Sequence, residues 1–223
     1  MTRYLRLSYS ISGSSPLYPG TLPIKIEAGK SIKKGNSCNT FLITLSNHMG
    51  THIDAPNHFH EKGRKISDYR IDELIFRRPV VIDCPKTEDE PITPHDLKGK
   101  IKKLNDIVLI RTGFYKFRGL KKYTHKNPYI LPQTALWLRT EYPNLKALGI
   151  DLISAGSCNH NEHSRETHQI LLGKKGCKGS PMLIIEDVDL SFDLNGLKEV
   201  IAAPLYIEGI DSSPCTLIGV IYG

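Results

Sequence analysis

The chain has 223 residues, 39% of them hydrophobic and 24% charged, so length and composition fit one globular domain spanning residues 1–223. Its formal net charge of +7 could suit a nucleic-acid binder, but the lysine-rich runs lack a nucleic-acid motif or interleaved stacking aromatics. We therefore expect solvated basic faces and no nucleic-acid partner. No apolar run approaches the roughly 20 residues of a membrane span, so no membrane partner is expected either.

The cysteines predict a reducing compartment. They are odd in number, scattered, and form no Cys-x-x-Cys pair, which argues for free thiols. They are Cys38, Cys84, Cys158, Cys177 and Cys215. The first residues lead directly into a strand-like alternation and not into a signal-peptide pattern. We expect a cytoplasmic location.

Strand-like and helix-like segments alternate along the chain, which predicts an α/β fold with a mixed sheet. Strands are expected at 41–45, 80–83, 106–111, 147–151, 182–186, 200–205 and 217–222. Helices are expected after the N-cap at Thr93, over 133–142, and over 166–172. In the second helix, Ala135, Leu136 and Leu138 should point inward, and the sole tryptophan, Trp137, should lie in the core or in an interface.

One segment is far more informative than the rest. Residues 46–60, Ser-Asn-His-Met-Gly-Thr-His-Ile-Asp-Ala-Pro-Asn-His-Phe-His, hold four histidines and one aspartate within thirteen positions. Neutral imidazole and carboxylate are ligands that Zn²⁺ or Mn²⁺ take from proteins. A lone histidine is usually a surface or hydrogen-bonded structural residue, but this clustering favours a metal site.

The spacing of the cluster suggests how it could converge on one point. His48, His52 and Asp54 occupy even positions, which share one face of an extended chain. A strand leading into Gly50 would allow close backbone approach, and a turn at Pro56 could bring His58 back over the same place. The residues therefore predict metal-dependent hydrolysis at a strand and loop.

This segment resembles the His-x-Gly-Thr-His-x-Asp-x-Pro-x-His signature of the cyclase-like metal hydrolases, which include bacterial kynurenine formamidase and isatin hydrolase. Weaker matches follow in the family's order over nearly the whole chain. They are residues 7–11, 16–20, 111–114, 149–151, 167–172, 183–186, 203–205 and 209–214. The resemblance implies a swivelling β/β/α domain, with a mixed sheet core and helices packed outside.

The resemblance also implies a site with two divalent ions. His48, His52 and Asp54 would hold the first ion, with Asp54 also reaching the second. His168 would bind the second ion and Glu186 would bridge both, while His58 would be the general acid/base. Tyr18 stands where kynurenine formamidases commonly have a tryptophan that lines the substrate pocket. Zinc is the first choice of ion and manganese the second, because ligand type does not separate them.

The implied reaction is hydrolysis of a carbon–nitrogen bond other than a peptide, with an aryl formamide of the N-formylkynurenine type as the first substrate. Paired ions can lower the pKa of a shared water, and a histidine can pass the proton to the leaving nitrogen. The alternatives are a cyclic amide or imide hydrolase, a cyclase, or a metal-binding module without catalysis. The resemblance further implies a homodimer or homotetramer, with the turn at Tyr18 reaching a neighbour's pocket.

Two segments depart from the family pattern and leave alternatives open. Residues 173–181 form a basic, glycine-rich loop, and residues 154–166 form a polar stretch that is either a substrate-facing loop or a solvated connection. The second stretch holds His160 and His163, either of which could replace His168 as a ligand. Asp151 and Asp211 are interpreted as cap or turn residues and are left out of the site.

Overall fold

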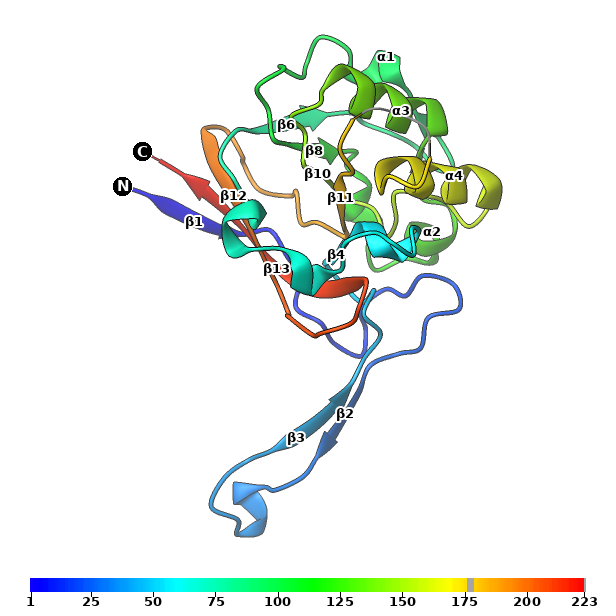
Figure 1. The fold of residues 1–223 in the computed structure, drawn as a ribbon. Coiled ribbons are helices and arrows are strands. Elements are labelled where there is room, and N and C mark those ends of the chain that lie inside the picture. Colours follow the sequence, from blue (N-terminus) through cyan, green and yellow to red (C-terminus); the bar gives the residue numbers. More distant parts are fainter. Residues whose placement is uncertain (176–178, 223) are drawn as a thin grey trace.

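One mixed sheet dominates the computed structural model, which describes residues 1–175 and 179–222 (Figure 1). The sheet order is β5-β12-β13-β4-β11-β10-β8-β6, and β1 pairs with β13 beside this path. Its strands are β1 Arg3–Arg6, β4 His52–Asp54, β5 Ile75–Phe76, β6 Pro79–Asp83, β8 Ile107–Arg111, β10 Ala147–Ile150, β11 Leu183–Glu186, β12 Leu197–Pro204 and β13 Ser212–Ile221. Two small sheets pair β2 Lys25–Ala28 with β3 Phe41–Thr44, and β7 Pro91–Ile92 with β9 Tyr129–Ile130.

The central strands separate two hydrophobic clusters. Strands β6, β8, β10 and β11 run parallel, whereas β4 lies antiparallel between β11 and β13. Successive side chains of a strand point to opposite faces. In β8, Val108 and Ile110 therefore join one cluster, and Ile107 and Leu109 join the other. Both faces of β8 are covered, which explains its unbroken apolar run.

Helices cover the face of Val108 and Ile110 (Figure 1). They are α1 Pro94–Leu97, α2 Lys121–His125, α3 Pro132–Glu141 and α4 Asn161–Leu171. Short 3₁₀ turns lie at Ile32–Lys34, Pro56–His58, Ile66–Asp68, Ile71–Leu74 and Phe114–Phe117. The opposite cluster lies between the central strands and the β5-β12-β13 part of the sheet, so the sheet curls around it. The predicted α/β fold, a mixed sheet core with helices outside, is confirmed.

Several sequence-based details were wrong. Leu136 does not point inward but is 40% exposed, because Ala135 and Leu138 share the buried face of α3 and Leu136 lies around the helix from them. Trp137 does pack against the core. Helix α4 begins at Asn161 and not at Glu166, so the second half of the polar stretch is helical. The expected strand leading into Gly50 is a turn, and β4 begins only at His52.

A two-stranded arm projects from the body (Figure 1). Strands β2 and β3 pair antiparallel, with Ile26 opposite Ile43 and Ala28 opposite Phe41, and every residue of both strands is exposed. These four side chains share one face of the ribbon, which is entirely apolar. Isolated two-stranded ribbons are at best marginally stable in water.

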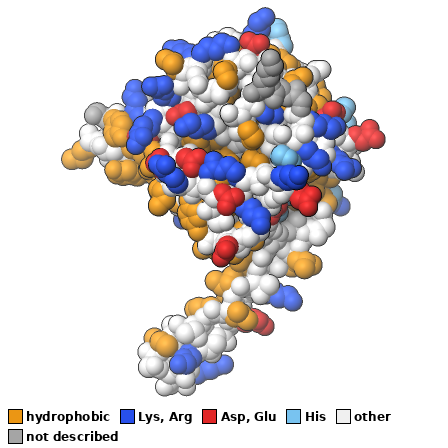
Figure 2. All heavy atoms as spheres, viewed as in Figure 1, with side chains coloured by type: hydrophobic (Ala, Val, Ile, Leu, Met, Phe, Trp, Pro, Cys, Tyr) orange, Lys and Arg blue, Asp and Glu red, His pale blue; other side chains and the backbone are white. Residues whose placement is uncertain are grey.

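The four described cysteines, Cys38, Cys84, Cys158 and Cys215, are free. Cys177 and Lys178 of the basic loop lie outside the described residues. Among the described residues, no helix is long and apolar enough to cross a membrane. Figure 2 shows Lys and Arg side chains spread over the visible face and mixed with Asp and Glu, as expected for solvated faces.

Candidate metal centre and active site

Strands β4 and β11 together present three buried side chains to one point. Glu186, the last residue of β11, pairs with His52 of β4, and Ile184 pairs with Asp54. His52, Asp54 and Glu186 therefore lie on the same face of the sheet, the face covered by the helices. Ile53, between His52 and Asp54, points to the opposite cluster. The even-position argument is confirmed for His52 and Asp54, because strand pairing makes their face a shared one.

The turn before β4 brings His48 to the same place. Gly50 adopts a left-handed backbone with φ of +64°, and a Cβ there would lie 3.0 Å from Ile11 Cγ1, so glycine suits this position on both counts. The Gly50 carbonyl accepts a 2.9 Å hydrogen bond from Nδ1 of His52. That bond leaves Nε2 of a neutral His52 as a lone pair directed at the carboxylates.

Helix α4 supplies His168 from a distant part of the chain. Its Nδ1 donates a 2.7 Å hydrogen bond to the carbonyl of Ser164, one turn earlier, and its Nε2 lies 3.3 Å from Oε1 of Glu186. His52 Nε2 lies 3.3 Å from the other oxygen, Oε2. Glu186 is thus placed between the two imidazoles.

The donor set fits a divalent cation. His52 Nε2 and Asp54 Oδ1 are buried and have no hydrogen-bond partner, although they lie 3.5 Å apart. With Nδ1 of His52 holding its proton on a backbone carbonyl, the facing atoms are both lone pairs, which repel unless a cation lies between them. Metal-bound histidines characteristically donate the other ring N–H to a carbonyl or carboxylate, as His52 and His168 do here.

Two groups of candidate ligand atoms overlap at Asp54. One contains His52, Asp54 and Glu186, and the other contains His48, Asp54 and His58; within each group the ligand atoms lie within 4.8 Å of one another. His48 Nδ1 is 3.1 Å from Asp54 Oδ1, while its Nε2 is 2.9 Å from Oγ of Ser212. The two groups of candidate ligand atoms therefore share the Asp54 carboxylate.

The electrostatics of the cluster favour ionised carboxylates. Burial raises the pKa of Glu186, but the adjacent His168 and His52 imidazoles outweigh it, and the pKa ends well below its usual value. For Asp54, burial is likewise outweighed by the adjacent His52 and His48 imidazoles, so its pKa is lowered. Burial lowers the pKa of His48, yet the nearby carboxylates of Asp211 and Asp54 raise it to about 10. The cluster thus attracts positive charge, from protons or from metal ions.

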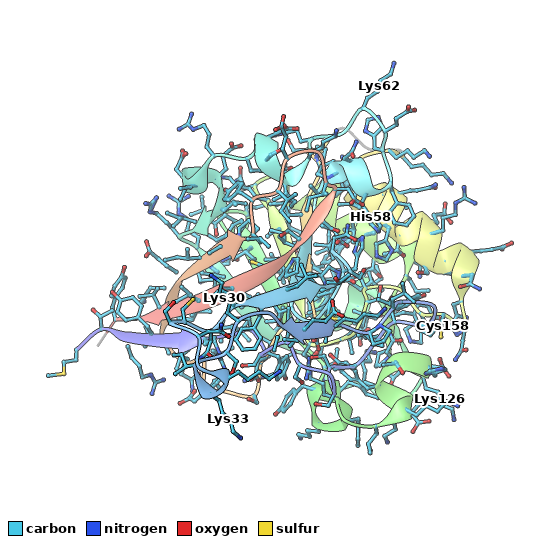
Figure 3. All side chains as sticks on the ribbon, turned by 90° about the horizontal axis from the view of Figure 1, so that it is seen from below. Lys30, Lys33, His58, Lys62, Lys126 and Cys158 are labelled. Carbon is cyan, nitrogen blue, oxygen red and sulfur yellow. The ribbon has the colours of Figure 1, made fainter. Side chains whose placement is uncertain are left out.

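His58 is held by a carboxylate that the sequence did not identify. Its Nδ1 donates a 2.6 Å hydrogen bond to Oδ2 of Asp211, whose Oδ1 accepts a 2.9 Å bond from Asn47 Nδ2. The nearby His48 imidazole and the hydrogen bond from His58 hold the pKa of Asp211 well below its usual range. Figure 3 shows His58 beside helix α4. An Asp–His pair of this kind fixes the tautomer and leaves Nε2 free to accept a proton.

A cavity of about 280 Å³ opens onto the cluster. Tyr18, Phe59 and Ile153 line it together with the site histidines and carboxylates. The Phe59 ring stacks on the His168 ring, with centroids 5.1 Å apart. Burial raises the pKa of Tyr18, which therefore stays a neutral phenol at neutral pH. The cavity thus places the aromatic rings of Tyr18 and Phe59 next to the polar candidate ligands.

All the predicted site residues meet at this cavity. It is lined by His48, His52, Asp54, His58, His168, Glu186 and Tyr18. His160 and His163 do not replace His168; their rings stack with Tyr129 instead. The polar stretch does contribute, because Ser154 and Ser164 line the cavity, whereas the described residues of the basic loop do not.

Sequence reasoning missed the groups that hold the ligands. Glu186 Oε1 accepts hydrogen bonds from Ser154 Oγ at 3.1 Å and from the Ala155 N–H at 2.7 Å. The sequence predicts Asp211 as a turn residue, whereas in the structure its carboxylate holds His58. Asp151 was rightly left out, because its carboxylate is occupied by Thr112 and Gly113.

Comparison with known proteins agrees with this fold. The Cyclase family profile matches residues 5–157, more than half of the chain. Kynurenine formamidase of Bacillus cereus is 27% identical over 214 residues, covering 96% of this chain and 95% of that protein. Isatin hydrolase A from Labrenzia aggregata, solved bound to benzyl benzoate, superposes with a TM-score of 0.83 at 21% identity, covering 100% of this chain and 94% of that one.

A third known protein has the same fold. A structure described as a potential metal-dependent hydrolase with cyclase activity superposes with a TM-score of 0.74 at 20% identity, covering both chains completely. Fold, ligand cluster and relatives together define the class of cyclase-like metal-dependent hydrolases. This chain belongs to the Cyclase family.

Proposed function

We propose that the chain is a metal-dependent amidohydrolase that cleaves a non-peptide C–N bond, with an aryl formamide of the N-formylkynurenine type as its first candidate substrate. The observation that carries the proposal is the pair of unpartnered buried atoms, His52 Nε2 and Asp54 Oδ1, facing each other beside Glu186. The full-length relation to kynurenine formamidase supports the linear amide, and the fold shared with isatin hydrolase supports amide hydrolysis in general.

The site residues divide into ligands and a proton carrier. Following the resemblance, His48, His52 and Asp54 would hold one ion and His168 the other, with Asp54 and Glu186 reaching both. The distances group the ligand atoms differently, His52 with Asp54 and Glu186, and His48 with Asp54 and His58. Zinc is the first choice of ion and manganese the second. Bound there, divalent ions would polarise a substrate carbonyl and make a water more acidic. His58 Nε2 would accept the proton of the attacking water and deliver it to the leaving nitrogen, while Asp211 stabilises the imidazolium through Nδ1.

Tyr18 and Phe59 would hold the aryl group. Their rings line the same cavity as the ligands, and Phe59 is already stacked on His168. An aryl ring packed against Tyr18 and Phe59 would orient its amide toward the candidate metal ligands. The same walls admit a fused bicyclic lactam, which keeps a cyclic amide hydrolase as the second candidate. We also propose a reducing, cytoplasmic location, which the free thiols of the four described cysteines support.

A substrate panel tests the proposal. Metal-loaded protein is assayed with formanilide, N-formylkynurenine, isatin and a cyclic imide, and metal-free protein is the control. We expect kcat/KM to be highest for an aryl formamide. Preferred turnover of isatin or the imide would replace the first candidate by the second. Absence of turnover on every substrate, with metal bound, would contradict catalysis and favour a metal-binding module.

We further propose that the chain forms a homodimer, or a homotetramer built from such dimers, through the projecting arm. The support is the apolar ribbon face, on which Ile26, Phe41 and Ile43 are 54%, 61% and 53% exposed. An exposed apolar face of this kind normally marks an interaction surface. The arm also carries the exposed Lys30 and Lys33, labelled in Figure 3.

Charged substitutions on the arm should dissociate this assembly. In a variant with Phe41→Asp and Ile43→Asp, we expect light scattering after gel filtration to report the monomer mass. Leu42→Asp is the matched control, because Leu42 is 63% exposed on the same strand but points to the opposite face. A monomeric wild type, or an equal effect of the control, would contradict the proposed interface.

A further inference from the structure

Beyond the residues that line the cavity, an ion pair lies directly behind the candidate metal ligands. Asp187 follows Glu186, is fully buried, and does not line the site cavity. Its carboxylate accepts two hydrogen bonds from Arg118, from Nε to Oδ1 at 2.8 Å and from the terminal nitrogen to Oδ2 at 2.6 Å. Tyr123 donates a third, from its hydroxyl to Oδ1 at 2.6 Å. The charge of Asp187 is thus neutralised without a metal ion.

The backbone of Asp187 is held as firmly as its side chain. Its φ is +52°, a left-handed conformation that costs free energy for a residue with a Cβ. Its N–H donates a 2.7 Å bond to the carbonyl of Leu152. Its carbonyl accepts a 2.6 Å bond from the hydroxyl of Thr51, the residue before His52. The turn after Glu186 is therefore tied to both neighbouring segments that carry site residues.

The partners of Asp187 extend the connection to the start of the chain. The Arg118 guanidinium lies 3.8 Å from the centroid of the Tyr9 ring. The Tyr9 N–H donates a 3.0 Å bond to the Thr51 hydroxyl, which in turn donates to Asp187. A planar, bidentate guanidinium stacked on an aromatic ring permits little movement of the carboxylate that it holds.

We infer that Asp187, through its ion pair with Arg118, is a positioning residue that sets the direction of the Glu186 carboxylate between His52 and His168. The inference rests on the proposed function, because Glu186 is the candidate bridging ligand. The ion pair stabilises the left-handed turn at Asp187. This turn fixes the end of β11 relative to the loop whose Ala155 N–H donates a hydrogen bond to Glu186. Loss of the pair would let Glu186 rotate without removing any ligand.

Cobalt binding tests the inference, because Co²⁺ occupies zinc sites and its visible spectrum reports ligand geometry. Asp187→Asn keeps the shape of the side chain but removes its negative charge. Arg118→Gln removes the guanidinium that donates two hydrogen bonds to Asp187. Removing groups that orient metal ligands typically weakens binding about 10- to 100-fold. We expect each variant to weaken Co²⁺ binding, measured by chelator competition, by about 10-fold or more, and to change the cobalt spectrum.

Asp151→Asn is the matched control. Asp151 is equally buried and follows the neighbouring strand β10, but its carboxylate accepts hydrogen bonds from Thr112 and Gly113 and not from Arg118. Its backbone carbonyl accepts a bond from Tyr123, which the substitution keeps. The substitution should lower the thermal midpoint while leaving the cobalt affinity and spectrum unchanged. Should Asp187→Asn fail to fold, Tyr123→Phe removes one hydrogen bond to Asp187 and should shift both readouts in the same direction by less.

The outcomes separate the two proposals. A wild type that binds no Co²⁺ would overturn the proposed metal site and this inference together. A wild type that binds Co²⁺, with Asp187→Asn unchanged in affinity and spectrum, would overturn the positioning role alone. Equal changes in Asp151→Asn would also overturn it, because they would reveal general destabilisation.

Discussion

Replacing His58 with alanine should lower turnover by about 10²- to 10⁴-fold, the usual contribution of a general acid/base, while metal content stays nearly unchanged. The physical reason is its pairing with Asp211, which orients the ring and leaves Nε2 available for proton transfer. Steady-state kinetics and elemental analysis of the same preparations measure the two quantities. Asp211→Asn should lower kcat in the same direction by a smaller factor, since the imidazole remains in place.

The same pair of measurements tests the alternative role of His58. Its ring centroid lies 4.3 Å from that of His48, and it belongs to one of the two candidate ligand groups. A parallel loss of metal and turnover in His58→Ala would identify it as a ligand and remove it as the proton carrier.

Replacing Asp54 should have the largest effect on metal content. Asp54 belongs to both candidate ligand groups, so Asp54→Asn should disrupt both cation positions and abolish turnover. We expect elemental analysis to show less than one ion per chain, against two for the wild type. His168→Ala should remove only the ion shared with Glu186, because its Nε2 lies beside Glu186 Oε1 alone among the candidate carboxylates.

Asp211→Asn is the contrasting variant for this experiment. Asp211 is a carboxylate at the same site, but it acts on His58, and its replacement should preserve metal content. Full metal occupancy in Asp54→Asn would contradict the shared-ligand arrangement. Loss of all metal in Asp211→Asn would show that the carboxylate network, and not Asp54 in particular, retains the ions.

Local patterns predicted the chemistry-bearing segment well. The spacing of His52 and Asp54 on one strand face depends only on the two-residue period of extended chain, and the structure keeps it. The apolar run Ile107–Ile110 likewise formed a buried strand. Patterning failed at Leu136 and at the start of α4, where side-chain exposure and helix length depend on packing against neighbours.

The residues in and behind the site that the sequence did not reveal share one property. Asp211 reaches His58 across 153 positions of sequence, and Arg118 reaches Asp187 across 69. A lone aspartate near a turn has the same local signature whether it caps the turn or holds a histidine. No periodicity separates these cases, so only the folded chain assigns them.

The sequence by itself determined the ligand types, the order of strands and helices around them, and the resemblance to the Cyclase family. These features depend on residue chemistry and on spacing between residues that are close in the sequence. Only the tertiary structure decided that Asp211 holds His58, that Asp187 and Arg118 tie the turn behind Glu186, and that the β2–β3 arm stands exposed. These features depend on which distant segments meet. That meeting is governed by the burial of whole sheet faces and not by any local run of residues.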